Sequence, residues 1–198
     1  HKAVAMSLLA TLAVAWIRAG GMPSLASISD RLVSDKTIRG TTVAAVLALL
    51  TVMMGGMVAK WAGAAVACAG FPLCGAGSLG GAAQHIQLTH RVLAYLTALH
   101  VVLMAVLIMR RREHLTVTLL AGIAAFVVVL QIVFGALMVL GGFPTVIRSL
   151  HQATGVLLWV STLMLTYAAR RVKHPPAAGA AVGATVLPHT PRMAGATA

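Results

Sequence analysis

The sequence predicts an all-α membrane protein, because its apolar residues come in runs long enough to cross a lipid bilayer. Of the 198 residues, 60% are hydrophobic and only 9% are charged, a balance that excludes an ordinary soluble domain. Hydrocarbon offers no hydrogen-bond partners, so a spanning segment pairs its backbone internally as a helix. The ten-residue alternation of a membrane barrel is missing. Five transmembrane helices are expected, at about residues 2–18, 41–60, 84–109, 115–140 and 150–169.

The first apolar run has two interpretations. Its basic start and small residues resemble a signal peptide, but the sequence begins with histidine and not with methionine. The run can also be aligned with residues 151–166, which places His1 opposite His151. We interpret residues 1–18 as the last transmembrane helix of a preceding, truncated repeat, and residues 19–40 as a cytoplasmic linker.

The later apolar runs make up the main membrane unit. We expect residues 41–170 to form a four-helix transmembrane half, with the helices at about 41–169 packed as one bundle. Residues 171–198 are rich in Pro, Ala and Gly and have no periodicity, so a disordered cytoplasmic tail is expected there.

The basic residues are distributed unevenly along the chain. The formal net charge is +12, but the clusters follow the ends of the apolar runs, which favours membrane orientation over nucleic-acid binding. If every run spans, one side carries Arg18, Arg31, Lys36, Arg39, Arg110, Arg111, Arg112, Arg170, Arg171 and Lys173, and the other Lys2, Lys60, Arg91 and Arg148. The positive-inside rule then places the C-terminus in the cytoplasm and the loops at about 61–83 and 141–149 outside.

Two cysteines, Cys68 and Cys74, lie in the short stretch ACAGFPLC. Their loop faces the outside in this topology, where disulfide bonds persist. A disulfide is therefore favoured over free thiols, and metal ligation is disfavoured because no further Cys or His lies near by.

Two histidines stand at similar depth in the membrane. His90 and His151 each lie within about two turns of the outer end of a helix, and the two helices run in the same direction. Two neutral imidazoles that face each other inside a bundle form an axial ligand pair for haem iron. The plain alternative is that each imidazole bonds to a neighbouring helix or to interfacial water. Because intramembrane polar residues are functional candidates by default, we expect both histidines to bind haem.

Other polar residues accompany His90 on the same helix. Arg91 follows it directly, and its guanidinium suits either a haem propionate or a lipid phosphate, so both interpretations stay open. Gln87 lies one turn earlier on the face of His90 and is expected to orient the cofactor site. His85 lies about 140° away around the helix and is expected at the membrane interface.

Several further residues are assigned structural roles. His100 and Gln131 are expected to bond between helices, and His114, after the arginine cluster, is expected to be solvated. Gly55 and Gly135 predict either close helix contacts or space for a macrocycle.

Four stretches occur in order across most of residues 42–160: GGMVAKWAGAAVACAGFPLC, QLTHRVLAYLTALH, LQIVFGALMVL and LHQATGVLLW. In this order they resemble the haem A synthase family of cytochrome oxidase assembly. The resemblance implies eight helices in two similar halves, each with a histidine pair on its second and fourth helices. His90 and His151 would form the pair of the C-terminal half, and His1 would be an iron ligand of the truncated half.

The resemblance also implies a reaction. The C-terminal half would bind haem b as a cofactor, while the other half oxidises the C8 methyl group of haem O to the formyl group of haem A. The catalytic half carries a glutamate where this chain has Gln87, so no catalytic residue is expected here. The implied partners are haem O synthase and cytochrome oxidase assembly proteins, and the expected location is a bacterial cell membrane.

Two other functions remain open on the residues alone. One is a b-type cytochrome that carries electrons without substrate chemistry, although such proteins usually use four histidines in one bundle. The other is a non-catalytic membrane assembly protein, which would need neither the cysteine loop nor the depth-matched histidines.

Overall fold

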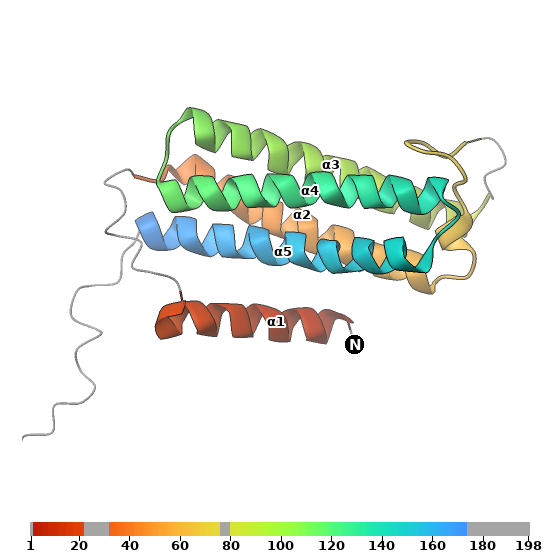
Figure 1. Cartoon of the computed structure of the whole chain (residues 1–198), viewed down its shortest axis with the longest axis horizontal. Helices are drawn as coiled ribbons and strands as arrows, with labels where there is room; N and C mark the ends of the chain where they lie inside the picture. Colours follow the sequence, from red (N-terminus) through yellow and green to blue (C-terminus); the bar gives the residue numbers. More distant parts are fainter. Residues whose placement is uncertain (1, 22–31, 76–79, 174–198) are drawn as a thin grey trace, which may run out of the picture.

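The structure is a computed structural model that describes residues 2–21, 32–75 and 80–173. The described part of the chain is helical apart from its connections (Figure 1). Its five α-helices are α1 (Lys2–Trp16), α2 (Asp35–Lys60), α3 (Ala82–Arg110), α4 (Leu115–Leu140) and α5 (Thr145–Lys173). A π-helical turn, Ile17–Gly21, continues α1, and a 3-10 turn, Ala64–Val66, lies between α2 and α3.

Helices α2 to α5 form an up-and-down bundle. Each helix packs against the next one along the chain, and α5 returns to pack against α2, which closes the ring (Figure 1). Consequently α3 and α5 stand opposite each other across the bundle, as do α2 and α4. Helix α1 lies outside this ring, alongside α5 and α2.

Among the described residues, four helices are long and apolar enough to cross a membrane, namely α2, α3, α4 and α5. This confirms an all-helical membrane protein with four of the five expected spans. The first apolar helix, Val4–Ala19, is shorter than these four, so its expected crossing is not established. Haem binding by the bundle also stays a prediction at this point.

Two helices begin at least five residues before their expected starts, and α5 also ends at Lys173, four residues later than expected. Helix α2 begins at Asp35 and not at residue 41, because the Ser34 side chain accepts a hydrogen bond from the Thr37 backbone N–H at 3.2 Å. The end of the expected linker is therefore helical. Helix α5 begins at Thr145, five residues early, directly after a turn in which Gly142 and Phe143 have positive φ. The apolar runs do not predict these two helix starts, because each helix extends beyond the stretch of apolar residues.

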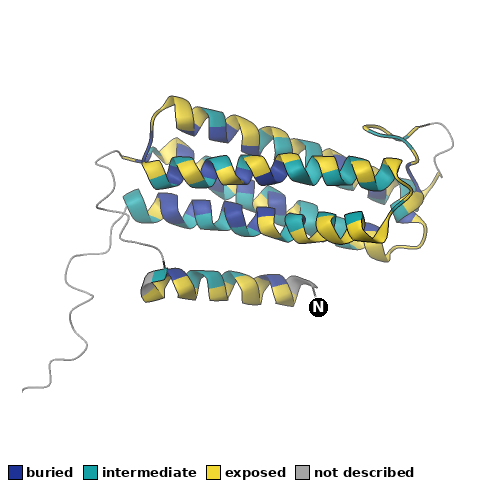
Figure 2. Ribbon diagram, viewed as in Figure 1, coloured by how far each residue is buried: buried dark blue, intermediate teal, exposed yellow. Residues whose placement is uncertain are grey.

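The outer surface of the bundle is apolar along most of its length. Large hydrophobic side chains are exposed on every helix of the ring, including Leu99, Leu103, Leu119, Phe126 and Leu157. Figure 2 marks exposed residues along α3 and α4. Such a surface suits lipid and would aggregate in water. The chain is therefore built as an integral membrane protein.

The densest packing lies in the half of the bundle nearest the α3–α4 connection. Its buried residues are mostly small or aliphatic, including Ala44, Ala48, Val101, Ala121, Ala124 and Leu165. Small side chains on facing helices let the backbones approach closely, which is how membrane helices associate. The other half of the bundle holds the cavity lined by His90 and His151.

At this densely packed end, α2 begins, α3 connects to α4 and α5 ends (Figure 1). Buried Glu113 accepts hydrogen bonds from the hydroxyls of Ser34 at 2.9 Å and Thr37 at 2.7 Å. Arg111 lies 3.8 Å from the same carboxylate oxygen. His114 is buried, contrary to expectation, because its Nδ1 accepts the Thr116 N–H and so caps α4.

The basic clusters after α3 and α5 lie at this one end of the bundle, as the charge pattern required. Lys173 also forms an ion pair with Asp35 there, which ties the end of α5 to the start of α2. Which side of the membrane this end faces stays a prediction. Residues 22–31 of the expected linker and 174–198 of the expected tail lie outside the described residues, as does His1.

Candidate functional site

A cavity of about 70 Å³ lies inside the bundle, in the half away from the basic end. Helices α2, α3, α4 and α5 all contribute to its walls, and the loop before α3 adds Phe71. Both His90 and His151 line it. Because they come from α3 and α5, which stand opposite each other in the ring, the imidazoles approach the cavity from two opposite sides. The remaining lining residues are Thr51, Gln87, Arg91, Ala94, Tyr95, Gln131, Ile132, Gly135, Met138 and Val139.

Each of these imidazoles lies against a glycine of a neighbouring helix. A Cβ atom on Gly55 of α2 would stand 3.1 Å from Cε1 of His90. A Cβ atom on Gly135 of α4 would stand 3.3 Å from Cε1 of His151. Both distances are shorter than ordinary contacts, so the glycines make the room that the rings occupy. The expected interpretations were close helix contacts or space for a macrocycle, whereas the neighbour of each glycine is an imidazole side chain.

The imidazole of His151 has a further neighbour in α4. The amide nitrogen of Gln131 lies 3.4 Å from His151 Nε2, and the Thr154 hydroxyl donates to the Gln131 carbonyl oxygen. Gly155 leaves space for this amide, because a Cβ there would stand 3.0 Å from Gln131 Nε2. Gln131 therefore bonds α4 to α5, as expected, and also forms part of the cavity wall.

Gln87 lies one turn before His90 and points into the same region. Its residue is 4% exposed, and its side-chain oxygen has no hydrogen-bond partner among the described residues. A buried amide oxygen without a partner is costly, so it marks a position where a donor group would be stabilised. Thr51 adds a hydroxyl nearby, which pairs with Thr97 at 2.8 Å.

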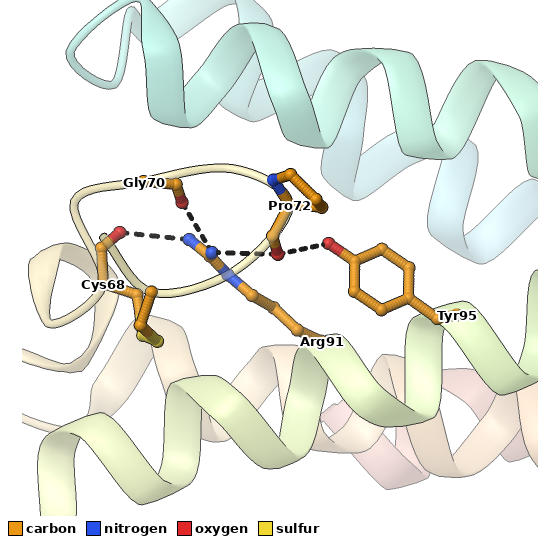
Figure 3. The surroundings of a disulfide bond; sticks show 6 residues. Cys68, Gly70, Pro72, Arg91 and Tyr95 are labelled. Atoms are coloured by element: carbon orange, nitrogen blue, oxygen red, sulfur yellow. Dashed lines mark hydrogen bonds between the residues drawn. A yellow bond between two sulfur atoms is a disulfide. The ribbon is translucent and has the colours of Figure 1, made fainter.

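Arg91 is buried and donates its hydrogen bonds to the loop before α3 (Figure 3). Its Nη2 donates to the Cys68 carbonyl at 3.0 Å, and its Nη1 donates to the Gly70 and Pro72 carbonyls at 2.6 and 3.3 Å. The partners expected for Arg91 from the sequence were a haem propionate or a lipid phosphate, and not this loop. A role towards a propionate stays a prediction, since Arg91 also lines the cavity.

The loop held by Arg91 is closed by a disulfide between Cys68 and Cys74. This is the bridge that the sequence favoured over free thiols. Tyr95 adds a second anchor, because its hydroxyl donates to the Pro72 carbonyl at 2.6 Å. Tyr95 is not among the residues predicted from the sequence, although its position four residues after Arg91 places both on one face of α3.

The other histidines of the described chain lie away from the cavity. His100 pairs through Nε2 with the Gly40 carbonyl at 2.9 Å, which confirms the expected bond between helices. His85 is exposed near the start of α3, in keeping with a place at the interface. His90 and His151 are thus the two imidazoles that the fold brings to one cavity.

The position of the two imidazoles at one cavity limits the kind of metal site that they could form. Among the described residues, no three His, Cys, Asp or Glu side chains group to hold a metal ion by themselves. Two opposed imidazoles suit a metal whose other positions are already filled by a macrocycle. The apolar wall formed by Ala94, Ile132 and Val139 suits the faces of such a ring.

Comparison with known proteins places the chain among membrane assembly factors. The family described as cytochrome oxidase assembly protein (COX15-CtaA) matches residues 1–163, which is most of the chain and includes all of the cavity-lining residues. A search of curated proteins finds no match. By its sequence, and with four apolar helices that suit a membrane protein, the chain belongs to the COX15-CtaA family of cytochrome oxidase assembly proteins.

Proposed function

We propose that this chain is the cofactor-binding part of a haem A synthase and that it holds haem b between His90 and His151. The observation that carries the proposal is that both imidazoles, carried by opposite helices, line one cavity in the bundle. Membership of the cytochrome oxidase assembly family supports the same function independently of the geometry.

The residues present fit a haem. The imidazoles are the ligand type required, glycines on α2 and α4 give the two rings the space that they occupy, and the unpartnered Gln87 oxygen offers an acceptor to a peripheral group or a water. The cavity of about 70 Å³ is smaller than a porphyrin. Binding therefore requires flexible lining side chains such as Met138 to move aside.

When bound, haem would supply a redox-active iron for electron transfer. His90 and His151 would hold the iron, and the apolar wall of the cavity would limit the access of water to it. Gln87 carries no charge and cannot serve as a carboxylate base. For this reason we assign this part of the protein to cofactor binding and not to substrate oxidation.

The proposed overall reaction converts the C8 methyl group of haem O into the formyl group of haem A. Its support is the family alone, with haem O synthase and other oxidase assembly proteins as the proposed partners. His1 lies outside the described residues and stays a proposed ligand of a second haem. The charge pattern supports an orientation with the cysteine loop outside and the C-terminus in the cytoplasm. A bacterial cell membrane is the proposed location.

Spectroscopy of the purified protein tests the proposal. The reduced-minus-oxidised spectrum should contain a b-type band that is lost in His90→Ala and in His151→Ala. His85→Ala is the matched control, because it removes an exposed histidine from the same helix as His90. A haem-free wild-type protein, or a band that survives both ligand substitutions, would refute the proposed site.

A second measurement separates the synthase from an electron carrier. Cells that lack their own haem A synthase should accumulate haem A when they express the complete gene product together with a source of haem O. Extracted haems are identified by chromatography. A protein that binds haem b but leaves haem O unchanged would be a b-type cytochrome and not a synthase.

A further inference from the structure

The geometry points to a cover over the haem pocket: the disulfide loop, residues 68–74, closes the outer mouth, and Arg91 and Tyr95 are the residues that position it. This inference rests on the proposed function, because it concerns how the pocket retains the haem that it is proposed to bind. The family match covers the loop and its anchors but assigns no role to them.

The first support is the way in which Arg91 is used. A buried guanidinium needs several hydrogen-bond acceptors, and here three of them are backbone carbonyls of one short loop, those of Cys68, Gly70 and Pro72 (Figure 3). Charge-assisted hydrogen bonds are stronger than neutral ones. The planar guanidinium thus fixes the loop at several points along its length.

The second support is Tyr95, which contacts the loop in two ways. Its hydroxyl donates to the Pro72 carbonyl at 2.6 Å, on the carbonyl that also accepts from Arg91 (Figure 3). Its ring meets Phe71 edge to face, with ring centroids 6.5 Å apart and an interplanar angle of 73°. Aromatic pairs prefer this arrangement, so Tyr95 fixes both the backbone and the one aromatic side chain of the loop.

The third support is the place of Phe71. It lines the cavity together with His90 and His151, although it lies on the loop and not on a helix. Phe71 therefore closes the pocket on the side of the loop. The disulfide joins the two ends of the loop, so anchors on its carbonyls hold the whole segment.

The anchors and the iron ligand share one helix. Arg91 directly follows His90, and Tyr95 lies one turn further along α3. Because all three side chains are carried by the same rigid element, the loop keeps its position relative to the ligand. Loosening the anchors should let water reach the pocket and speed the loss of haem, and water should lower the reduction potential by stabilising the ferric form.

The test uses the haem-loaded protein and three variants. Tyr95→Phe removes only the hydroxyl, Phe71→Ala removes the closing side chain, and Tyr167→Phe is the matched control at the far end of α5. The rate of haem transfer to excess apomyoglobin and the midpoint potential are measured. Tyr95→Phe should speed transfer roughly two- to tenfold, as for one lost hydrogen bond. Phe71→Ala should speed it more, both with a lower potential, and Tyr167→Phe should match the wild type.

A second measurement, made on the protein without haem, tests whether Arg91 and Tyr95 hold the loop in place. Hydrogen exchange of the loop amides should be faster in the apo forms of Tyr95→Phe and Arg91→Lys, since lysine lacks the planar fork that reaches several carbonyls. If the wild type binds haem but Tyr95→Phe and Phe71→Ala release it at the wild-type rate, the cover is refuted and the proposed function stands. A wild type without haem refutes both.

Discussion

Replacing Gly135 by alanine tests whether the histidine pocket is built to the size of its rings. Gly135 lies on α4, and a Cβ atom there would stand 3.3 Å from Cε1 of His151. Real Cβ contacts are seldom this short, so the imidazole must move by a few tenths of an ångström. Gly122→Ala on the same helix is the control, because a Cβ there meets nothing within 4 Å.

The size of the effect follows from how a packed ring can move. A well-packed interior leaves the imidazole little free space, so a shift takes its side-chain dihedrals away from their minimum. A dihedral about 30° from its minimum costs about 0.5–1.5 kcal/mol, and this smaller shift costs no more than that, so haem affinity should fall by at most roughly tenfold. Gly55→Ala should cost more, since its Cβ would stand 3.1 Å from Cε1 of His90.

Haem affinity is measured by titrating apo protein in detergent and following the b-type absorbance. Thermal unfolding of the same apo samples tests the fold, which should be unaffected or slightly more stable because alanine favours helix over glycine. The expected order of affinities is Gly122→Ala equal to wild type, then Gly135→Ala, then Gly55→Ala. Equal affinity in all three variants would refute the idea that the glycines make room for the ligand rings.

Three further predictions concern the rest of the chain. Mass spectrometry without reduction should detect Cys68 and Cys74 in one linked peptide, and free alkylated thiols would contradict the bridge. A reporter fused after Lys173 should report the cytoplasm, because the basic end of the bundle is expected inside; an outside signal would reverse the topology. Glu113→Leu should lower the free energy of unfolding by about 1–3 kcal/mol, since it leaves two hydroxyls without their acceptor. An unchanged melting temperature would show that this cluster contributes nothing.

Much of the fold could be predicted because hydrocarbon restricts the choices. A long apolar run in a membrane has to be a helix, so α4 appears at the expected residues 115–140 and α3 within two residues of its expected bounds. The start of α2 was placed too late, because Ser34 and Asp35 extend the helix beyond the apolar run. Capping depends on local hydrogen bonds that a hydropathy pattern does not contain.

The candidate site was only partly visible in the sequence. His90 and His151 stand out because imidazoles are rare and costly in lipid, and the structure brings both to one cavity. The partner of Arg91 was not visible, because it consists of backbone carbonyls about twenty residues away in a loop. Carbonyls belong to every residue, so no residue type marks them as acceptors.

The sequence by itself determined the class of protein, the four long apolar helices, the basic end and the residues capable of ligating a metal. These properties follow from composition and local periodicity, which act over one helix at a time. Only the tertiary structure decided that α3 faces α5, that glycines on α2 and α4 receive the two imidazoles, and that Arg91 holds the disulfide loop. Each of these depends on how separate helices and a loop pack together, and packing is set by the shapes of surfaces that are distant in the chain.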